Sequence, residues 1–496
     1  MRICVFEHPR MASEKRFNDI ANTPLWSCLM AGYAAAALEN AGYETRLLDS
    51  SAASLTFETA ADELLAFQPD LLCINTVYFW ENTPVFFKFL SELKEKGFSG
   101  HINLFGFFPS LVYREILKTR DGVDSIAVGE FEETLVELAD ALQRGEPLET
   151  IQGLALPSCI KDRKERQRSP AGQIDRFVFP KRISLDGVVT ILASRGCYNH
   201  CSFCPVPSFY NQGALWRGRS PENIAKEITV LVDLGVKDFY FADPNFIGPG
   251  KAGKKRVIKL MELIRPLGIR FGMETRPGDL DEAILVQLVA SGFNSLLMGV
   301  ESGSEAVLGS IGKSSGPSQA SDAIRLCRQY GIEPEIGFLM FVPDSRLGDL
   351  RENIQFLMKN GLLDRLDRTV NLLCHRQIVL AGTRGYRIFE EQGRLEKQGI
   401  FGFEGRVRFA DPRVKQMADL VMGACHTVLR SMSDDRSPVY WKDPVENVSD
   451  RVNRYLVHLF FSLLQIVETN KTPIPISEEK SRIADEINRL IFKENA

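Results

Sequence analysis

The sequence lacks the features that mark a membrane protein or a secreted protein. Its longest apolar stretch, Tyr455 to Val467, is interrupted by polar residues and is too short to span a bilayer. The N-terminus, Met1 to Phe6, reads as a strand and lacks the organisation of a signal peptide. The net charge is only −4 over 496 residues, which argues against nucleic acid as the main partner. We therefore expect a cytoplasmic protein with about three domains.

The cysteines do not form the pattern of a disulfide framework. Most of the 10 cysteines are scattered among apolar neighbours, which is typical of free thiols in a reducing compartment. These scattered residues are Cys4, Cys28, Cys73, Cys159, Cys327, Cys374 and Cys425. The remaining three, Cys197, Cys201 and Cys204, lie within eight residues in the pattern C-x₃-C-x₂-C. Such crowding needs a separate explanation.

The clustered cysteines follow an apolar run, Val188 to Ala193, that predicts a buried parallel strand. They would lie at the carboxyl end of that strand, where parallel α/β folds keep their chemistry. Soft thiolate ligands select zinc or an iron–sulfur cluster. A structural zinc site needs a fourth ligand, and His200 would have to fold back to provide it. The spacing leaves three interpretations, namely a four-iron cluster with one open iron, a zinc site, and free thiols.

The cysteine pattern, with Phe203 before its last cysteine, resembles the signature of radical S-adenosylmethionine (SAM) enzymes. This resemblance implies a 4Fe–4S cluster on Cys197, Cys201 and Cys204, with Phe203 shielding it and SAM chelating its open iron. Reductive cleavage of SAM then gives a 5′-deoxyadenosyl radical, which abstracts hydrogen from a substrate. The family also implies a reducing partner such as flavodoxin or ferredoxin.

Residues 187–375 repeat a strand and a helix six times, which suggests the open (β/α)₆ barrel that this family uses. The expected strands lie near 188–193, 237–242, 269–275, 295–301, 334–341 and 368–373. The resemblance implies that several strand ends contact SAM. Asp243 and Asn245 would contact its amino group, Arg276 its carboxylate, Glu301 its ribose hydroxyls, and Gly337 and Phe338 its adenine. Ser302, which follows Glu301, is a further expected cofactor contact.

Residues 1–145 alternate strand and helix five times, which predicts a doubly wound, Rossmann-like parallel sheet with a ligand over its carboxyl edge. The expected strands are 2–7, 43–48, 70–76, 101–106 and 123–128, and the expected helices lie near 25–40, 57–67, 83–96, 109–118 and 130–143. No G-x-G-x-x-G follows the first strand, so a dinucleotide is poorly supported.

This N-terminal segment resembles the cobalamin-binding domain that precedes many radical SAM modules. The similar features include Pro24-Leu25, the run from Ala41 to Glu44, the run from Pro69 to Leu72, the turn from Gly106 to Ser110, and the run from Gly122 to Glu130. By position in such domains, the cobalamin contacts would be Asn75, Thr76, Gly106 and Gly129. A degenerate module that binds nothing is the alternative.

The D-x-H-x-x-G motif of histidine-ligated cobalamin proteins is missing. The first strand is followed by His8-Pro9-Arg10, without the motif's aspartate or glycine. A metal-bound imidazole usually needs a second-shell acceptor. We therefore interpret His8 as an ordinary loop histidine and expect cobalamin to bind without a histidine ligand.

The rest of the chain is predicted as a linker and a helical segment. Residues 146–186 include the mixed-charge run 161–168, and residues 376–496 are expected to be mainly helical, with helices near 414–429 and 445–467. The fold class is therefore α/β with four parts: a cobalamin-binding domain at 1–145, a linker at 146–186, a radical SAM barrel at 187–375 and a helical domain at 376–496.

The resemblance to enzymes with this domain order implies methylation of an unactivated carbon in a small-molecule or natural-product substrate. One SAM would supply the radical, cobalamin the methyl group, and a second SAM would remethylate the cobalt. Cyclisation or rearrangement without methyl transfer is the first alternative, and a non-catalytic cobalamin or cluster sensor is the second. Methylthiotransfer is disfavoured because Cys4, Cys28 and Cys73 each lie within or beside apolar runs, unlike the cluster cysteines of that family.

Overall fold

The structure is a computed structural model that describes residues 1–10, 29–119, 122–160, 167–210, 216–440, 447–469 and 474–492. The contacts divide the chain into two compact units. The first comprises Met1–Glu274, Val286–Asn294 and Val379–Arg406, and the second comprises Thr275–Leu285, Ser295–Ile378 and Val407–Ala496. Pro24-Leu25, Cys28 and most of the charge run 161–168 lie outside the described residues.

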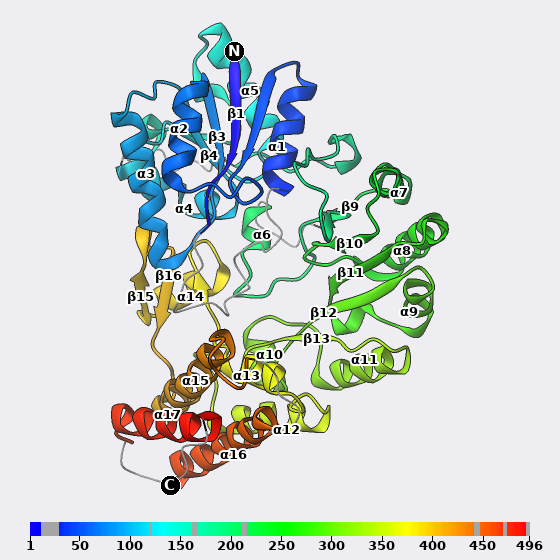
Figure 1. Ribbon diagram of the computed structural model, residues 1–496, viewed down its shortest axis with the longest axis vertical. Helices are drawn as coiled ribbons and strands as arrows, with labels where there is room; N and C mark the ends of the chain where they lie inside the picture. Colours follow the sequence, from blue (N-terminus) through cyan, green and yellow to red (C-terminus); the bar gives the residue numbers. More distant parts are fainter. Residues whose placement is uncertain are drawn as a thin grey trace. The chain divides into compact units, whose positions relative to one another are not determined.

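The first unit begins with a six-stranded sheet in the order β2-β1-β3-β4-β5-β6 (Figure 1). The strands are β1 (Arg2–Glu7), β2 (Glu44–Asp49), β3 (Leu71–Asn75), β4 (His101–Phe105), β5 (Ser125–Ala127) and β6 (Leu154–Ala155). The first five run parallel, and β6 pairs antiparallel with β5. The chain order reverses between β1 and β3, and ligands of doubly wound sheets bind at such a switch point.

Five helices cover this sheet, as the sequence predicts. They are α1 (Leu29–Asn40), α2 (Phe57–Phe67), α3 (Thr83–Glu95), α4 (Phe107–Thr119) and α5 (Glu132–Arg144). Helix α1 packs beside α5, and α2 packs beside α3. The two pairs lie on opposite faces of the sheet in Figure 1, so β1 and β3 are buried almost throughout and are continuous apolar runs. The predicted doubly wound sheet is confirmed.

The first unit also contains the beginning of the second parallel sheet. Strands β7 (Val189–Ile191), β10 (Asp238–Phe241) and β11 (Arg270–Thr275) are parallel neighbours in that order. Helices α7 (Pro221–Asp233) and α8 (Gly250–Ile264) pack against each other. Helix α7 starts where the sequence indicates, because Ser220 Oγ accepts the Asn223 N–H and Pro221 occupies the first turn. Between β7 and α7, the short strands β8 (Ser194–Arg195) and β9 (Arg217–Gly218) pair antiparallel.

Strand β12 (Phe293–Glu301) runs into the second unit, where it pairs in parallel with β13 (Glu335–Phe338). The helices of this region are α9 (Glu282–Val289), α10 (Glu305–Ser310), α11 (Pro317–Gln329) and α12 (Leu347–Lys359).

The strand expected at 368–373 is wrong, because this segment lies in helix α13 (Leu366–Cys374). Leu366, Val370 and Leu373 are buried at the i, i+4, i+7 spacing of a helix. Just beyond the helix, Phe341 and Arg376 form an isolated parallel bridge.

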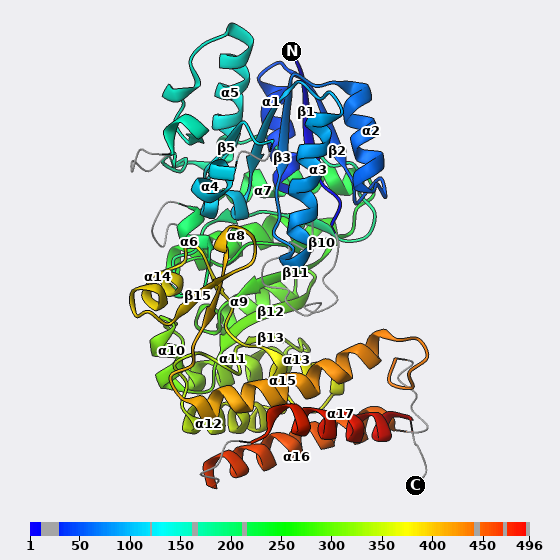
Figure 2. The same ribbon diagram turned by 90° about the vertical axis from the view of Figure 1, so that its left-hand side faces the viewer.

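The C-terminal part is mainly helical, as expected. Helices α15 (Pro412–Ser433), α16 (Val448–Thr469) and α17 (Ile476–Phe492) pack against one another in the second unit (Figure 2). The sequence does not predict the small sheet that precedes them in the first unit, in the order β14-β16-β15. Its elements are β14 (Val379–Leu380), α14 (Arg384–Glu391), β15 (Leu395–Gln398) and β16 (Glu404–Val407). Among the described helices, none has both the length and the apolar character needed to cross a membrane.

Candidate active site

The three clustered cysteines lie on the loop between β8 and the short helix α6 (Val206–Phe209). Cys197 is buried, whereas Cys201 and Cys204 are half-buried, as is Phe203. The Cys204 N–H donates to the Cys201 carbonyl at 3.2 Å, which places these two residues on one turn.

A further contact on the loop shows how it suits a cluster. Asn199 Nδ2 donates to Cys201 Sγ at 2.9 Å, and hydrogen bonds of this kind tune iron–sulfur centres. Across the described residues, no three His, Cys, Asp or Glu side chains are already grouped so that they could hold a metal ion. The donor set still fits a cluster, because three soft thiols share a short loop and two of them are partly exposed.

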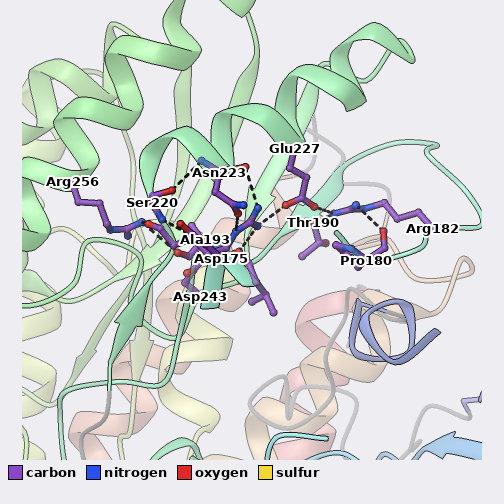
Figure 3. A network of polar contacts seen from close by, with 12 residues as sticks. Asp175, Pro180, Arg182, Thr190, Ala193, Ser220, Asn223, Glu227, Asp243 and Arg256 are labelled. Atoms are coloured by element: carbon purple, nitrogen blue, oxygen red, sulfur yellow. Dashed lines mark hydrogen bonds and ion pairs between the residues drawn. The ribbon is translucent and has the colours of Figure 1, made fainter. Parts of the chain in front are cut away.

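The backbone that leads into the cysteine loop is held by a buried carboxylate. Asp243 is fully buried after β10, and its Oδ2 accepts the Ala193 N–H at 3.1 Å. Its Oδ1 accepts the Ser194 hydroxyl. Burial raises the pKa of Asp243 to about 6, and these two hydrogen bonds oppose that rise. Figure 3 shows Asp243 directed at Ala193.

The same backbone also accepts hydrogen bonds from Arg219, which belongs to a network with Glu227 and Arg182. Figure 3 shows Glu227 and Arg182 of this network. Arg219 donates from its N–H to the Ala193 carbonyl at 2.9 Å and from Nη1 to the Leu192 carbonyl at 2.9 Å. Arg219 Nη1 is paired with Glu227 Oε2 of α7 at 2.5 Å, and Arg182 Nη2 reaches Glu227 Oε1 at 2.7 Å. The start of the cysteine loop is therefore fixed before any cofactor is bound.

Asn245 also has a structural role. Its Oδ1 accepts the Gly248 N–H at 2.7 Å, and its carbonyl accepts the Trp216 Nε1–H at 3.0 Å. The structure thus brings Asp243 and Asn245 together beside the cysteine loop, since Ser194 Oγ also lies 3.3 Å from the Asn245 carbonyl oxygen. Their contact with SAM remains a prediction.

One carboxyl that the sequence does not single out is that of Glu274 on β11, which lies beside Tyr240 of β10. Tyr240 and Glu274 are partly exposed, whereas their strand neighbours Phe239, Phe241 and Met273 are buried on the other face. The Tyr240 hydroxyl donates to Glu274 Oε1 at 3.3 Å. Burial raises the pKa of Glu274 to about 7, and the charge of nearby Asp243 adds to the rise. The alternation along β11 could have identified this residue.

In the second unit, Arg276 and Glu301 are held at strand ends. Arg276 is buried and donates from Nη2 to Ser314 and, at 3.2 Å, to Ser315 Oγ. Glu301 has a φ of 73°, which is uncommon for a residue with a side chain, and its Oε1 accepts from Lys313 Nζ at 3.1 Å. Backbone strain of this kind concentrates at functional sites.

Of the other SAM contacts expected in this unit, Ser302 and Phe338 are buried and Gly337 is half-buried. The hydroxyl of Ser302 donates to Asn353 Oδ1 at 2.7 Å and is fully buried. Phe338 is buried and stacks on Phe356 with ring centroids 6.2 Å apart. A Cβ added to Gly337 would lie 3.6 Å from the Gly299 Cα, an ordinary van der Waals distance, so packing does not require glycine at this position. Contact with SAM stays a prediction for each of these residues.

The residues predicted to contact cobalamin lie at the carboxyl edge of the first sheet. Asn75 is buried and donates from Nδ2 to Glu7 Oε2 at 2.8 Å, across the β1/β3 switch point. Gly106 has a φ of 111°, and a Cβ there would lie 2.7 Å from Asn75 Oδ1. The Thr76 N–H donates to the Phe105 carbonyl at 2.9 Å. Gly129 has a φ of 81° after β5, and its N–H donates to Ser110 Oγ at 3.0 Å.

His8 also lies at this edge, with both ring nitrogens engaged by the protein. The Val77 N–H donates to Nε2 at 3.3 Å, so Nε2 is the acceptor and Nδ1–H donates to the Pro9 carbonyl at 2.9 Å. The imidazole is fully buried against aromatic rings, including that of Phe86. Burial lowers the pKa of His8 to about 3, so the ring is neutral.

Known proteins resemble the chain over most of its length. A family model described as the radical SAM superfamily matches residues 191–357. The chain is 27% identical over 376 residues to "Uncharacterized methyltransferase PH0819" of Pyrococcus horikoshii, which covers 72% of this chain and 78% of the relative. It is 30% identical over 349 residues to the anaerobic magnesium-protoporphyrin IX monomethyl ester cyclase of Synechocystis, which covers 67% of each protein.

Two solved structures share the fold. The cobalamin-dependent SAM radical enzyme OxsB, with aqua-cobalamin and SAM bound, superposes with a TM-score of 0.71 at 20% identity, covering 98% of this chain and 75% of OxsB. The radical SAM methyltransferase TsrM from Kitasatospora setae, with cobalamin and a 4Fe–4S cluster bound, gives a TM-score of 0.65 at 16% identity, covering 98% of this chain and 99% of TsrM.

The cysteine loop and the family match define a radical SAM enzyme. The chain belongs to the radical SAM superfamily, and membership implies a 4Fe–4S cluster and SAM. Its fold is that of the cobalamin-dependent radical SAM enzymes.

Proposed function

We propose that this radical SAM enzyme uses cobalamin to methylate an unactivated carbon of a small-molecule substrate. The observation that carries the proposal is a doubly wound sheet, with a switch point between β1 and β3, preceding the cysteine loop in the same chain. OxsB and TsrM combine this fold with cobalamin, and TsrM is a methyltransferase by name. The Pyrococcus relative is also named a methyltransferase.

Different residues of this chain would bind the two cofactors. A 4Fe–4S cluster on Cys197, Cys201 and Cys204 would supply a 5′-deoxyadenosyl radical from SAM, and cobalamin at the edge of the first sheet would supply the methyl group. Arg276 would bind the SAM carboxylate as a charged donor, and Glu301 would accept from the ribose hydroxyls. The remaining proposed SAM contacts are Phe203, Asp243, Asn245, Ser302, Gly337 and Phe338. The proposed cobalamin contacts are Asn75, Thr76, Gly106 and Gly129.

We propose further that cobalamin binds without a histidine ligand from the protein. For His8 to ligate cobalt, Nε2 would have to give up the Val77 N–H, which would then be buried without a partner. The ring would also have to leave its buried aromatic surroundings.

Cyclisation without methyl transfer is the second candidate, because a magnesium-protoporphyrin ester cyclase is 30% identical over 67% of this chain. We propose that a flavodoxin or ferredoxin delivers the electron in either case. We also retain the domain division 1–145, 146–186, 187–375 and 376–496 as a proposal about function, with the last segment shaping the substrate pocket.

The ratio of two SAM products separates the two candidate reactions. Methylation consumes a second SAM as methyl donor, so it gives S-adenosylhomocysteine together with 5′-deoxyadenosine. We expect both products in about equal amounts when the reduced, cobalamin-loaded protein is screened against candidate substrates. Substrate-dependent 5′-deoxyadenosine without S-adenosylhomocysteine would favour cyclisation, and neither product would indicate a sensor.

A further inference from the structure

Two glutamates, Glu130 just before α5 and Glu132 at its first position, bind two arginines that flank the cysteine loop. Glu130 Oε1 accepts from Arg195 Nη1 at 3.1 Å and from Arg217 Nη2 at 2.7 Å. Glu130 Oε2 accepts from Arg217 Nη1 at 3.0 Å and from the Ala171 N–H at 2.9 Å. Glu132 Oε1 accepts from Arg195 Nη2. All of these residues belong to the first unit.

This cluster is buried and balanced in charge. The side chains of Arg195 and Arg217 are 7% exposed, and those of Glu130 and Glu132 are 5% and 3% exposed. The Arg195 guanidinium also lies over the Phe177 ring, 4.4 Å from its centroid. Burying ions costs much of what their attraction returns, so such a network is weak evidence for stability. We therefore interpret the network as fixing the positions of the segments that it joins, rather than as a source of stability.

The geometry connects the edge of the first sheet to the cysteine loop. Glu130 directly follows Gly129, one of the proposed cobalamin contacts, at the end of β5. Arg195 is the last residue of β8, two positions before Cys197. Arg195 and Arg217 are opposite each other in the β8–β9 pair, so both guanidiniums reach the same carboxylate. Glu130 therefore fixes a two-stranded ribbon rather than a single flexible side chain.

We propose that Glu130 is a positioning residue that, through Arg195 and Arg217, sets the separation between cobalamin on the first sheet and the cluster on the cysteine loop. This inference rests on the proposed use of cobalamin. Methyl transfer requires the substrate to reach both cofactors, whereas SAM cleavage requires only the cluster. Altering Glu130 should consequently separate the two reactions, and a misplacement of 1 Å can cost about 10²-fold in rate.

The test compares parent protein with the variants Glu130→Gln and Glu130→Asp, each loaded with iron and cobalamin. Glu130→Gln removes the charge at constant shape, and Glu130→Asp keeps the charge but shortens the side chain by one methylene. Glu137→Gln is the matched control, because Glu137 lies on α5, the helix that follows Glu130, and its pair with Arg168 leaves its own side chain 47% exposed. Pulsed EPR would measure the distance between cob(II)alamin and the reduced cluster.

We expect both Glu130 variants to retain iron and cobalt and to cleave SAM. Their iron–cobalt distance distribution should shift or broaden by about 1 Å, and methyl transfer per SAM cleaved should fall about 10- to 100-fold. Glu137→Gln should match the parent. The inference would be overturned if both Glu130 variants kept the iron–cobalt distance and the methyl transfer per SAM cleaved of the parent. Loss of a cofactor in these variants would also overturn it, because it would indicate a role in assembly alone. A parent protein without cobalt would instead refute the proposed function, and the inference with it.

Discussion

At the residue scale, several buried side chains of the candidate site form hydrogen bonds to the backbone that leads into the cysteine loop. Asp243 accepts from the Ala193 N–H and the Ser194 hydroxyl, and Arg219 donates to the Leu192 and Ala193 carbonyls. Radical chemistry needs its reacting groups in fixed positions and away from water. A rigid lead-in to the cysteine loop meets the first of these needs.

We predict that Asp243→Asn destabilises the first unit and weakens cluster binding. The amide keeps one acceptor oxygen and replaces the other with a donor, so one of the two buried donors loses its partner at a cost of about 1–3 kcal/mol. Thermal unfolding and iron content after desalting would measure the two effects. Asp238→Asn is the control, since Asp238 lies on β10, the strand that precedes Asp243, in an exposed pair with Arg270. Equal behaviour of the two variants would contradict the role of Asp243.

A second residue-scale prediction concerns pH. The pKa of Glu274 is raised from 4.5 to about 7, mainly by burial, so the folded protein favours the protonated carboxyl. Its stabilising contribution is present at low pH and is lost as the pH rises through about 7. Glu274→Gln keeps the acceptor for the Tyr240 hydroxyl and does not titrate. We therefore expect its melting temperature to rise relative to that of the parent between about pH 5 and pH 8. A difference that stays constant over this range would count against the raised pKa.

At the scale of elements, strong periodic patterns predict the structure and weak ones do not. The strands and helices of residues 1–145 lie within a few residues of their expected positions, because alternating apolar runs and short turns identify them. The prediction for segment 368–373 is wrong because its closely spaced apolar residues are compatible with either a strand or a helix. In the structure it forms a helix that packs against α15 and α16. Strands β14 to β16 have two to four residues each, which is too short to give a pattern.

In the candidate site, too, the sequence predicts local motifs but not contacts between distant residues. The cysteine spacing identifies Cys197, Cys201 and Cys204 from the sequence alone. The contact of Glu130 with Arg195 joins residues 65 positions apart, and no local pattern encodes such a pair. The raised pKa of Glu274 likewise arises from tertiary burial, which periodicity can only suggest.

Helix α7, which follows the cysteine loop, provides a prediction at this scale. Ser220 accepts the Asn223 N–H as its N-cap, so Ser220→Ala should lower the unfolding free energy by about 1 kcal/mol. Thr229→Ala, at an exposed position of the same helix, is the control and should be neutral or slightly stabilising. Thermal melts of both variants would measure this. A Ser220→Ala melting temperature as high as that of the control would show that the cap is dispensable.

At the scale of the whole molecule, the chain combines two parallel sheets with different tasks. The first has a switch point at β1/β3 and the turn of Gly129, and the second begins at the strand that leads to the cysteines. Glu130 and Glu132 connect these two regions within the first unit. We therefore propose, as the central claim, that a single chain holds cobalamin and a cluster together.

Cofactor content tests that claim most directly. The protein would be purified without oxygen, reconstituted with iron and sulfide, mixed with hydroxocobalamin and desalted. We predict about four irons and about one cobalt per chain, with iron lost in Cys201→Ala and cobalt retained. Four irons without cobalt would contradict the use of cobalamin and favour radical chemistry with an empty first sheet. Zinc in place of iron would contradict the account as a whole.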